Sequence, residues 1–167
     1  MVTLYKLDNV VRQRAFRIVL EAVSRPGRIC HLPVQTDSPC RFTYLLMVLE
    51  TLLDQEATHY MVEEDGSPQL GCRLYEETKS PPVSIEEADF IVAPYGSTKG
   101  KLCCAKRGLP EYPDLSATIV YAVDSIAQGE GETPKSILRG PGIAGHTAFP
   151  LMEGFDHREI RHLCRVN

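Results

Sequence analysis

A glycine-rich run near the C-terminal end has the spacing of a nucleotide-binding fingerprint. Residues 140–145 fit the pattern G-x-G-x-x-G and follow an expected strand over 136–139. In that fingerprint the glycines lead into a helix whose N-terminus holds a pyrophosphate. Pro150 lies only five residues past the last glycine, which leaves no room for such a helix. The pattern therefore favours a tight turn that needs positive φ angles or close packing, and a phosphate-binding loop is the alternative.

Two further sets of residues resemble reaction centres and are incomplete. The run Tyr95–Lys101 follows an expected strand as a phosphate loop does, but it lacks the first glycine, and Leu102 stands where Ser or Thr must hold magnesium. The adjacent acids of 63–65 and 86–87 have no apolar surroundings that would raise one pKa for acid catalysis. We interpret them as solvated charges.

Cysteine and histidine positions do not predict a disulfide framework or a metal site. The six cysteines are at positions 30, 40, 72, 103, 104 and 164, with no C-x-x-C pair. The first nine residues have no export signal, so we expect a cytoplasmic protein with reduced thiols. His157 and His162 are five residues apart and would lie on different faces of a helix. We expect no catalytic, cofactor-binding or metal-binding residues. This pattern is more typical of a binding or assembly subunit than of a stand-alone enzyme.

The elements that would position these residues indicate one α/β domain over residues 1–167 with a mixed sheet. The hydrophobic periodicity predicts helices and strands in alternation along the first two thirds of the chain. Helices are expected at 10–24, 39–53, 67–75 and, small, at 97–105, and strands at 28–32, 58–62, 88–93, 116–123 and 136–139. A flexible hairpin connection is expected at 129–132 and a weak helical pattern from 152 to the end.

The first helix is basic in an acidic protein. Net charge is −4, so the chain gives no reason to expect a nucleic-acid partner, and its longest apolar runs are too short to span a membrane. Within 12–28, five arginines accompany the single Glu21. An apolar stripe on the same helix is formed by Phe16, Val19, Leu20 and Val23. The stripe predicts docking, and the arginines form either a solvated, salt-bridged face or a contact with phosphate or an acidic partner.

Two motifs, with ordered segments between them, resemble a known family. The motifs are the run Arg14–Gly27, a Phe-Arg helix ending in Ser-x-Pro-Gly, and the run Leu138–Ile143, a strand followed by Gly-x-Gly-Ile. Between them lie an apolar helix at 45–53, an Ala-Asp-Phe strand at 88–90 and a Ser-Ala-Thr-Ile-Val strand at 116–120. In this order, over about residues 10–160, the sequence resembles the H subunit of the bacterial carbon-phosphorus lyase core complex.

The resemblance implies a fold and a set of partners. Such subunits are similar to the three-layer large domain of pyridoxal-phosphate-dependent transferases without the cofactor, form homodimers, and assemble with the G, I and J subunits. The complex couples a phosphonate to the ribose of ATP with loss of adenine, giving ribose 1-phosphonate 5-triphosphate. A radical subunit later breaks the carbon-phosphorus bond. The resemblance implies no active site in the H subunit itself.

We therefore expect the protein to act through contacts that its outer surface makes with other subunits. Family members continue with further strand-forming segments where this chain stops at Asn167, so we expect an uncovered sheet edge that a dimer or partner covers. The candidate partner-contact residues are Arg17, Arg25, Arg139, Gly140, Pro141, Gly142 and Ile143. The alternative hypothesis is a small-molecule enzyme or nucleotide-binding domain that uses the loop 140–145.

Overall fold

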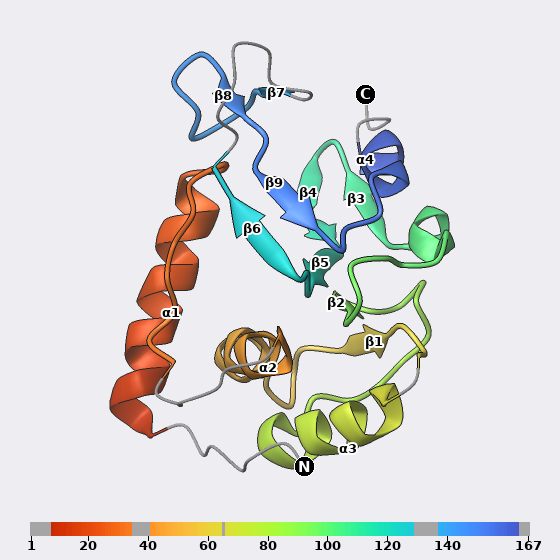
Figure 1. The fold of residues 1–167 in the computed structure, drawn as a ribbon. Helices are drawn as coiled ribbons and strands as arrows, with labels where there is room; N and C mark the ends of the chain where they lie inside the picture. The colour runs from red at the N-terminus through yellow and green to blue at the C-terminus, as the bar shows by residue number, and fades with distance from the viewer. Residues whose placement is uncertain (1–7, 35–40, 65, 129–136, 164–167) are drawn as a thin grey trace.

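A parallel three-stranded sheet forms the centre of the protein. The computed structural model describes residues 8–34, 41–64, 66–128 and 137–163 (Figure 1). The sheet has the order β1-β2-β5, with β1 at His59–Met61, β2 at Phe90–Ala93 and β5 at Thr118–Tyr121. Its register places Ile91 beside Tyr60 on one side and beside Ile119 on the other.

The middle strand is buried on both faces, as its continuous apolar sequence predicts. Val92 packs with the core residues of two helices, α2 (Arg41–Leu52) and α3 (Ser67–Thr78). Ile91 packs on the other face with Ile85 and Ala88. Both helices lie on one side of the sheet in Figure 1, so the core is built around β2.

Antiparallel pairs surround this sheet. β3 (Arg107–Leu109) pairs with β4 (Tyr112–Ser116), β6 (Ser125–Ala127) with β9 (Leu151–Glu153), and β7 (Ile137–Leu138) with β8 (Thr147–Ala148). Over the described residues, the parallel and antiparallel pairings therefore fall in separate sheets, whereas the sequence predicts one mixed sheet. The similarity to a pyridoxal-phosphate-dependent transferase domain stays a prediction.

The first helix forms where the sequence predicts it, but it buries a different face. α1 spans Asn9–Ser24, and the side chain of Asp8 caps it by accepting from the Val11 N–H at 2.7 Å. Val11 and Ala15 are buried beside Met47 of α2, whereas Phe16, Leu20 and Val23 are exposed. α1 therefore contacts α2 through the face of Val11 and Ala15 and not through the predicted docking stripe. Small Ala15 lets the two helices approach closely, and periodicity alone does not distinguish between overlapping faces.

Two shorter predictions need correction, and a third concerns residues outside the described part of the chain. Residues 28–32 form no strand, because they pair with none of the strands that the structure describes, and they place Leu32 against the α1–α2 contact. The helix expected at 97–105 is the short 3₁₀ helix η1 (Lys101–Cys104). The N-cap of α3 is Gly66, and Ser67, which follows it, is buried and accepts from the Glu64 N–H at 2.9 Å. The expected connection at 129–132 lies outside the described residues.

A single acidic side chain joins the beginnings of two central strands. Asp89 accepts hydrogen bonds from the Thr58 N–H at 3.1 Å and the Thr58 hydroxyl at 2.7 Å, and it pairs with Lys106. These hydrogen bonds, the one from Lys106 first, lower the pKa of Asp89 to about 2. The carboxylate thus fixes the start of β2 beside β1.

Within the described part of the chain, no helix combines the length and apolar character that crossing a membrane requires.

Candidate functional site

The two family-like motifs pack directly against each other. The turn that ends α1 contains Gly27 at φ +89°, where an added Cβ would lie 2.6 Å from Cγ2 of Thr147 on β8. Gly142 has φ +80°, and a Cβ there would lie 2.7 Å from the carbonyl oxygen of Ser24 and 3.2 Å from Cδ of Pro26. Each glycine therefore permits an approach that a side chain would prevent. We call this contact, between residues 24–27 and 138–147, the motif junction.

The loop of the motif junction forms a turn that leads into a strand. The Ile143 N–H donates to the Gly140 carbonyl at 3.2 Å, which closes a turn over 140–143. The chain then runs into β8 at Thr147. The interpretation as a tight, glycine-dependent turn is confirmed at Gly142, where both a positive φ angle and close packing occur.

The structure brings most of the predicted contact residues to one end of α1. Arg25 caps α1 and is exposed, with an ion pair to Glu21 at 3.5 Å, and Arg28 pairs with the same carboxylate at 2.7 Å. Exposed Arg139 follows β7, and Gly140 and Pro141 are also exposed, while Ile143 is half-buried. Figure 1 shows the β7–β8 pair beyond the C-terminal end of α1. Arg17 lies about two turns earlier on the same helix and is exposed.

The apolar stripe that the sequence predicts to dock is exposed and extends this surface. Phe16 is 46% exposed, Leu20 57% and Val23 72%, and they recur at positions i, i+4 and i+7 of α1. Residues at this spacing share one face of a helix. The exposed stripe lies beside Arg17 and runs toward the motif junction, so apolar and cationic groups adjoin on the same helix.

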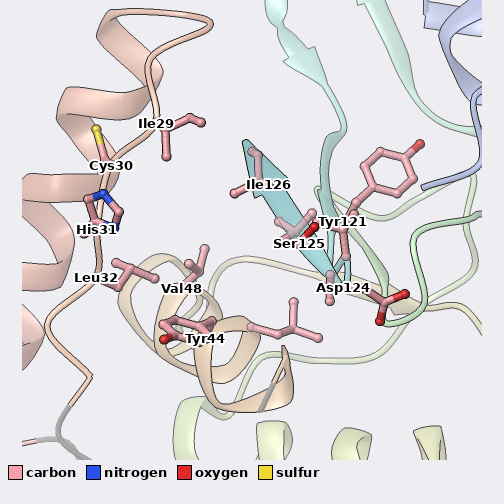
Figure 2. Close-up of a pocket in the computed structure, with 14 residues that line it drawn as sticks. Ile29, Cys30, His31, Leu32, Tyr44, Val48, Tyr121, Asp124, Ser125 and Ile126 are labelled. Atoms are coloured by element: carbon pink, nitrogen blue, oxygen red, sulfur yellow. The ribbon is translucent and has the colours of Figure 1, made fainter. Parts of the chain in front are cut away.

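An open apolar groove continues from the turn. It has a volume of about 480 Å³ and lies between the extended residues 29–32, α2 and the end of β5 with β6. Figure 2 shows Ile29, Val48 and Ile126 around this opening, with Ser125 and Asp124 toward the end of β5. The lining is mainly aliphatic, with the polar side chains of His31, Asp124 and Ser125 among it.

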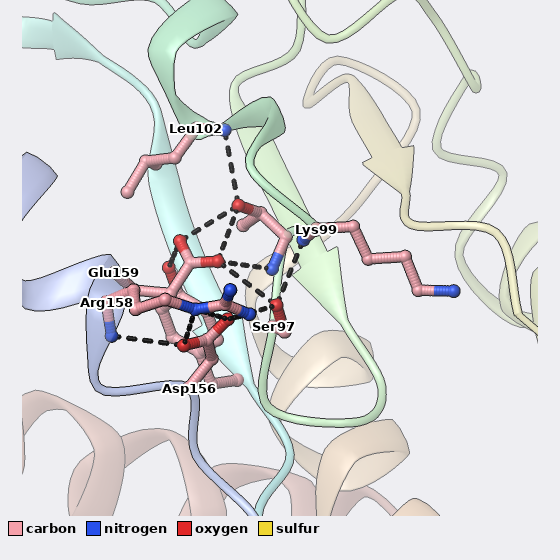
Figure 3. A network of polar contacts seen from close by, with 8 residues as sticks. Ser97, Lys99, Leu102, Asp156, Arg158 and Glu159 are labelled. Carbon is pink, nitrogen blue, oxygen red and sulfur yellow. Dashed lines mark hydrogen bonds and ion pairs between the residues drawn. The ribbon is translucent and has the colours of Figure 1, made fainter.

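A cluster of polar side chains lies at the carboxyl edge of the parallel sheet. Glu159, only 3% exposed, belongs to α4 (Arg158–Leu163) and accepts from the Thr98 N–H at 2.8 Å and from the Tyr121 hydroxyl at 3.1 Å. The Thr98 hydroxyl donates to the same carboxylate at 2.8 Å. Burial, and then the negative charge of Glu159, raises the pKa of Tyr121. Figure 3 shows this cluster.

This cluster explains why the run Tyr95–Lys101 resembles a phosphate loop. The loop does present an N–H and a hydroxyl from Thr98, but both bind the protein's own carboxylate at Glu159. Nearby, Arg158 pairs with Asp156 at 2.8 Å and Lys99 with Glu64 at 3.1 Å. The hydrogen bonds to Glu159 form an internal clamp that attaches α4 to the sheet. Nothing in the local sequence around Glu159 distinguishes it from a solvated helix-start acid.

The described cysteines and potential metal ligands are a further set of groups that could do chemistry. Cys30, Cys72, Cys103 and Cys104 are free thiols, while Cys40 and Cys164 lie outside the described residues. No group of three or more His, Cys, Asp or Glu side chains gathers as a metal site in the parts of the chain with a description. The surface of α1 and the motif junction brings exposed apolar and cationic side chains together, and we take it as the candidate site.

Comparison with known proteins gives the family. A family model described as bacterial phosphonate metabolism protein (PhnH) matches residues 5–163. The chain is also 31% identical over 149 residues to the "Putative C-P lyase subunit protein HtxG" of Stutzerimonas stutzeri, with 87% of this chain covered. It spans 66% of that relative, slightly less than two thirds of its length. The chain belongs to the PhnH family, as its two motifs indicate.

Proposed function

We propose that this chain acts in phosphonate catabolism as a non-catalytic subunit of a carbon-phosphorus lyase core complex. It would support the coupling of phosphonate to the ribose of ATP, giving ribose 1-phosphonate 5-triphosphate, by holding sister subunits in place. The family membership and the C-P lyase name of the relative support the complex. The motif junction supports the mode of action, because the two family-like motifs pack together beside exposed Arg139 at the end of α1.

The partners follow from the same reasoning. We propose the G, I and J subunits and a second copy of this chain as partners, in the cytoplasm. Exposed Arg17 and Arg139 favour an acidic partner surface, and the stripe Phe16–Leu20–Val23 supplies the apolar area that a stable contact requires. The groove beside residues 29–32 continues this surface.

Co-expression with the G, I and J subunits tests the proposal. We expect Arg17→Glu and Arg139→Glu each to reduce co-purification of the sister subunits by about tenfold or more, because a rim charge is reversed against an acidic surface. Growth on a phosphonate as the phosphorus source should fall in parallel. Arg107→Glu, on exposed β3, is the matched control and should leave both unchanged. Unchanged assembly and growth in both test variants would refute the assignment.

A nucleotide-binding domain using residues 140–145 is the alternative, and the geometry disfavours it. The loop leads into β8 and not into a helix that could hold a phosphate. Equilibrium binding of ATP, NAD and pyridoxal phosphate to the purified chain separates the hypotheses. The proposed subunit should bind none tightly, and micromolar binding that Gly142→Ala abolishes would favour the alternative.

A further inference from the structure

Two neighbouring thiols share one exposed position on η1. Cys103 and Cys104 are both exposed, and their sulfur atoms are 3.8 Å apart. The Cys103 thiol also contacts the Gly100 carbonyl at 3.3 Å. The two side chains of adjacent residues therefore meet each other and open solvent at the same time. Neither thiol takes part in the surface proposed to hold sister subunits.

Their spacing suits a bridging atom better than a direct bond. Two sulfur atoms bound to one centre at about 2.3 Å, with an angle of about 100–110° between the bonds, lie about 3.5–3.8 Å apart, close to the observed 3.8 Å. A disulfide instead requires about 2.05 Å between sulfurs and a Cα separation of about 4.4–6.8 Å, whereas adjacent residues have Cα atoms about 3.8 Å apart. The pair can thus accept a shared ligand with little movement.

The surroundings select the kind of ligand. In the described structure, no third potential ligand joins the two thiols into a larger metal cluster. Charged groups near Cys104 are Lys101, which donates to the Tyr60 hydroxyl at 2.6 Å, and Glu86. The neighbouring Cys103 thiol raises the pKa of Cys104, so the ligand must be thiophilic enough to displace two protons. Hard cations such as Mg²⁺ prefer oxygen and are excluded.

We propose that Cys103 and Cys104 form a chelating dithiol that binds a soft, thiophilic centre through both sulfur atoms. The representative ligand of this class is a trivalent organoarsenical. Two arsenic-oxygen bonds of the hydrated arsenical break and two arsenic-sulfur bonds form. Each thiol proton leaves with a hydroxyl as water. Arsenic stays trivalent and no electron is transferred, so no oxidant or reductant is needed.

Titration of the full chain with phenylarsine oxide tests the proposal. One equivalent should remove two titratable thiols per chain, and the adduct should resist a large excess of a monothiol and be reversed by a dithiol. Cys103→Ser and Cys104→Ser should each lose this monothiol-resistant binding by at least tenfold. Cys72→Ser, which removes an exposed thiol on α3, is the matched control and should bind as the parent does.

Two outcomes would overturn the proposal. One is failure of the parent chain to lose two thiols at one equivalent of the arsenical. The other is retention of monothiol-resistant binding in both single variants, which would place the dithiol elsewhere. Because both side chains are exposed, the substitutions should not change thermal unfolding, and this is measured on the same samples.

Discussion

Gly142 faces the carbonyl oxygen of Ser24 so closely that a Cβ at this position would lie 2.7 Å from the oxygen. The contact joins the end of α1 to the turn over 140–143, and these are the two segments that carry the family resemblance. Because the neighbour is backbone and not a flexible side chain, it cannot move aside cheaply. The glycine therefore determines how the two segments fit together.

Replacing this glycine should open the motif junction. Gly142→Ala adds the cost of a positive φ angle, about 1–2 kcal/mol, and a steric cost of about 1–3 kcal/mol from the Ser24 carbonyl. Gly145→Ala is the matched control, because Gly145 has φ +81° and nothing within 4 Å of its Cβ position. Urea unfolding of both variants measures the difference. Equal destabilisation would show that the close approach contributes nothing.

The buried carboxylate of Glu159 should hold α4 in place. Glu159→Gln replaces an oxygen that accepts from Thr98 or Tyr121 with an amide that donates, so a buried donor loses its partner. The expected loss is about 1–3 kcal/mol. Glu153→Gln, an exposed acid of β9 that accepts from the Ser125 hydroxyl, should change stability little. Hydrogen exchange should become faster in α4 and at Thr98, and unchanged exchange there would contradict the clamp.

Acid should weaken the link between β1 and β2 through Asp89. The folded-state pKa is about 2, below the usual value of 3.8, so the folded protein binds fewer protons than the unfolded chain in this range. The stabilisation is complete above the unfolded pKa and is lost as pH falls toward 2. Lys106→Met removes the largest cause of the shift and should reduce this pH dependence. NMR titration of the Asp89 carboxyl measures its pKa in the parent and in the variant. An unchanged pKa in Lys106→Met would refute the assignment. Lys79→Met is the control and should leave the pKa of Asp89 unchanged.

Local signals in the sequence predict the helices better than the contacts between them. Asp8, Pro26 and Gly27 mark the limits of α1 because capping and termination depend on neighbours in sequence. The buried face of α1 depends on where α2 lies, so the periodicity predicts a docking stripe through Leu20 but not that this stripe stays exposed in the folded chain.

In the candidate site, too, local conformation can be predicted from the sequence and contacts between distant segments cannot. A turn that needs glycine at 142 could be predicted, because positive φ angles favour glycine. Its contact with Ser24 could not, because two distant turns carry no signal of their proximity. Glu159 was missed for a related reason: its donors, Thr98 and Tyr121, come from two other elements.

The exposed stripe of α1 should contribute to assembly and not to folding. Val23 is 72% exposed and Val11, on the same helix, is 4% exposed. Val23→Ser should therefore leave the free energy of unfolding within about 0.5 kcal/mol of the parent, whereas Val11→Ser should lower it by about 2 kcal/mol or more.

The second measurement is the amount of the G, I and J subunits that co-purifies with each variant. Val23→Ser should reduce it although the chain is as stable as the parent, because apolar area on the contact face is lost without any change in the core. Equal destabilisation by the two substitutions would mean that another part of the chain covers Val23. Full assembly in Val23→Ser would exclude this face from the contact and leave Arg139 and the loop 140–143 as the remaining surface.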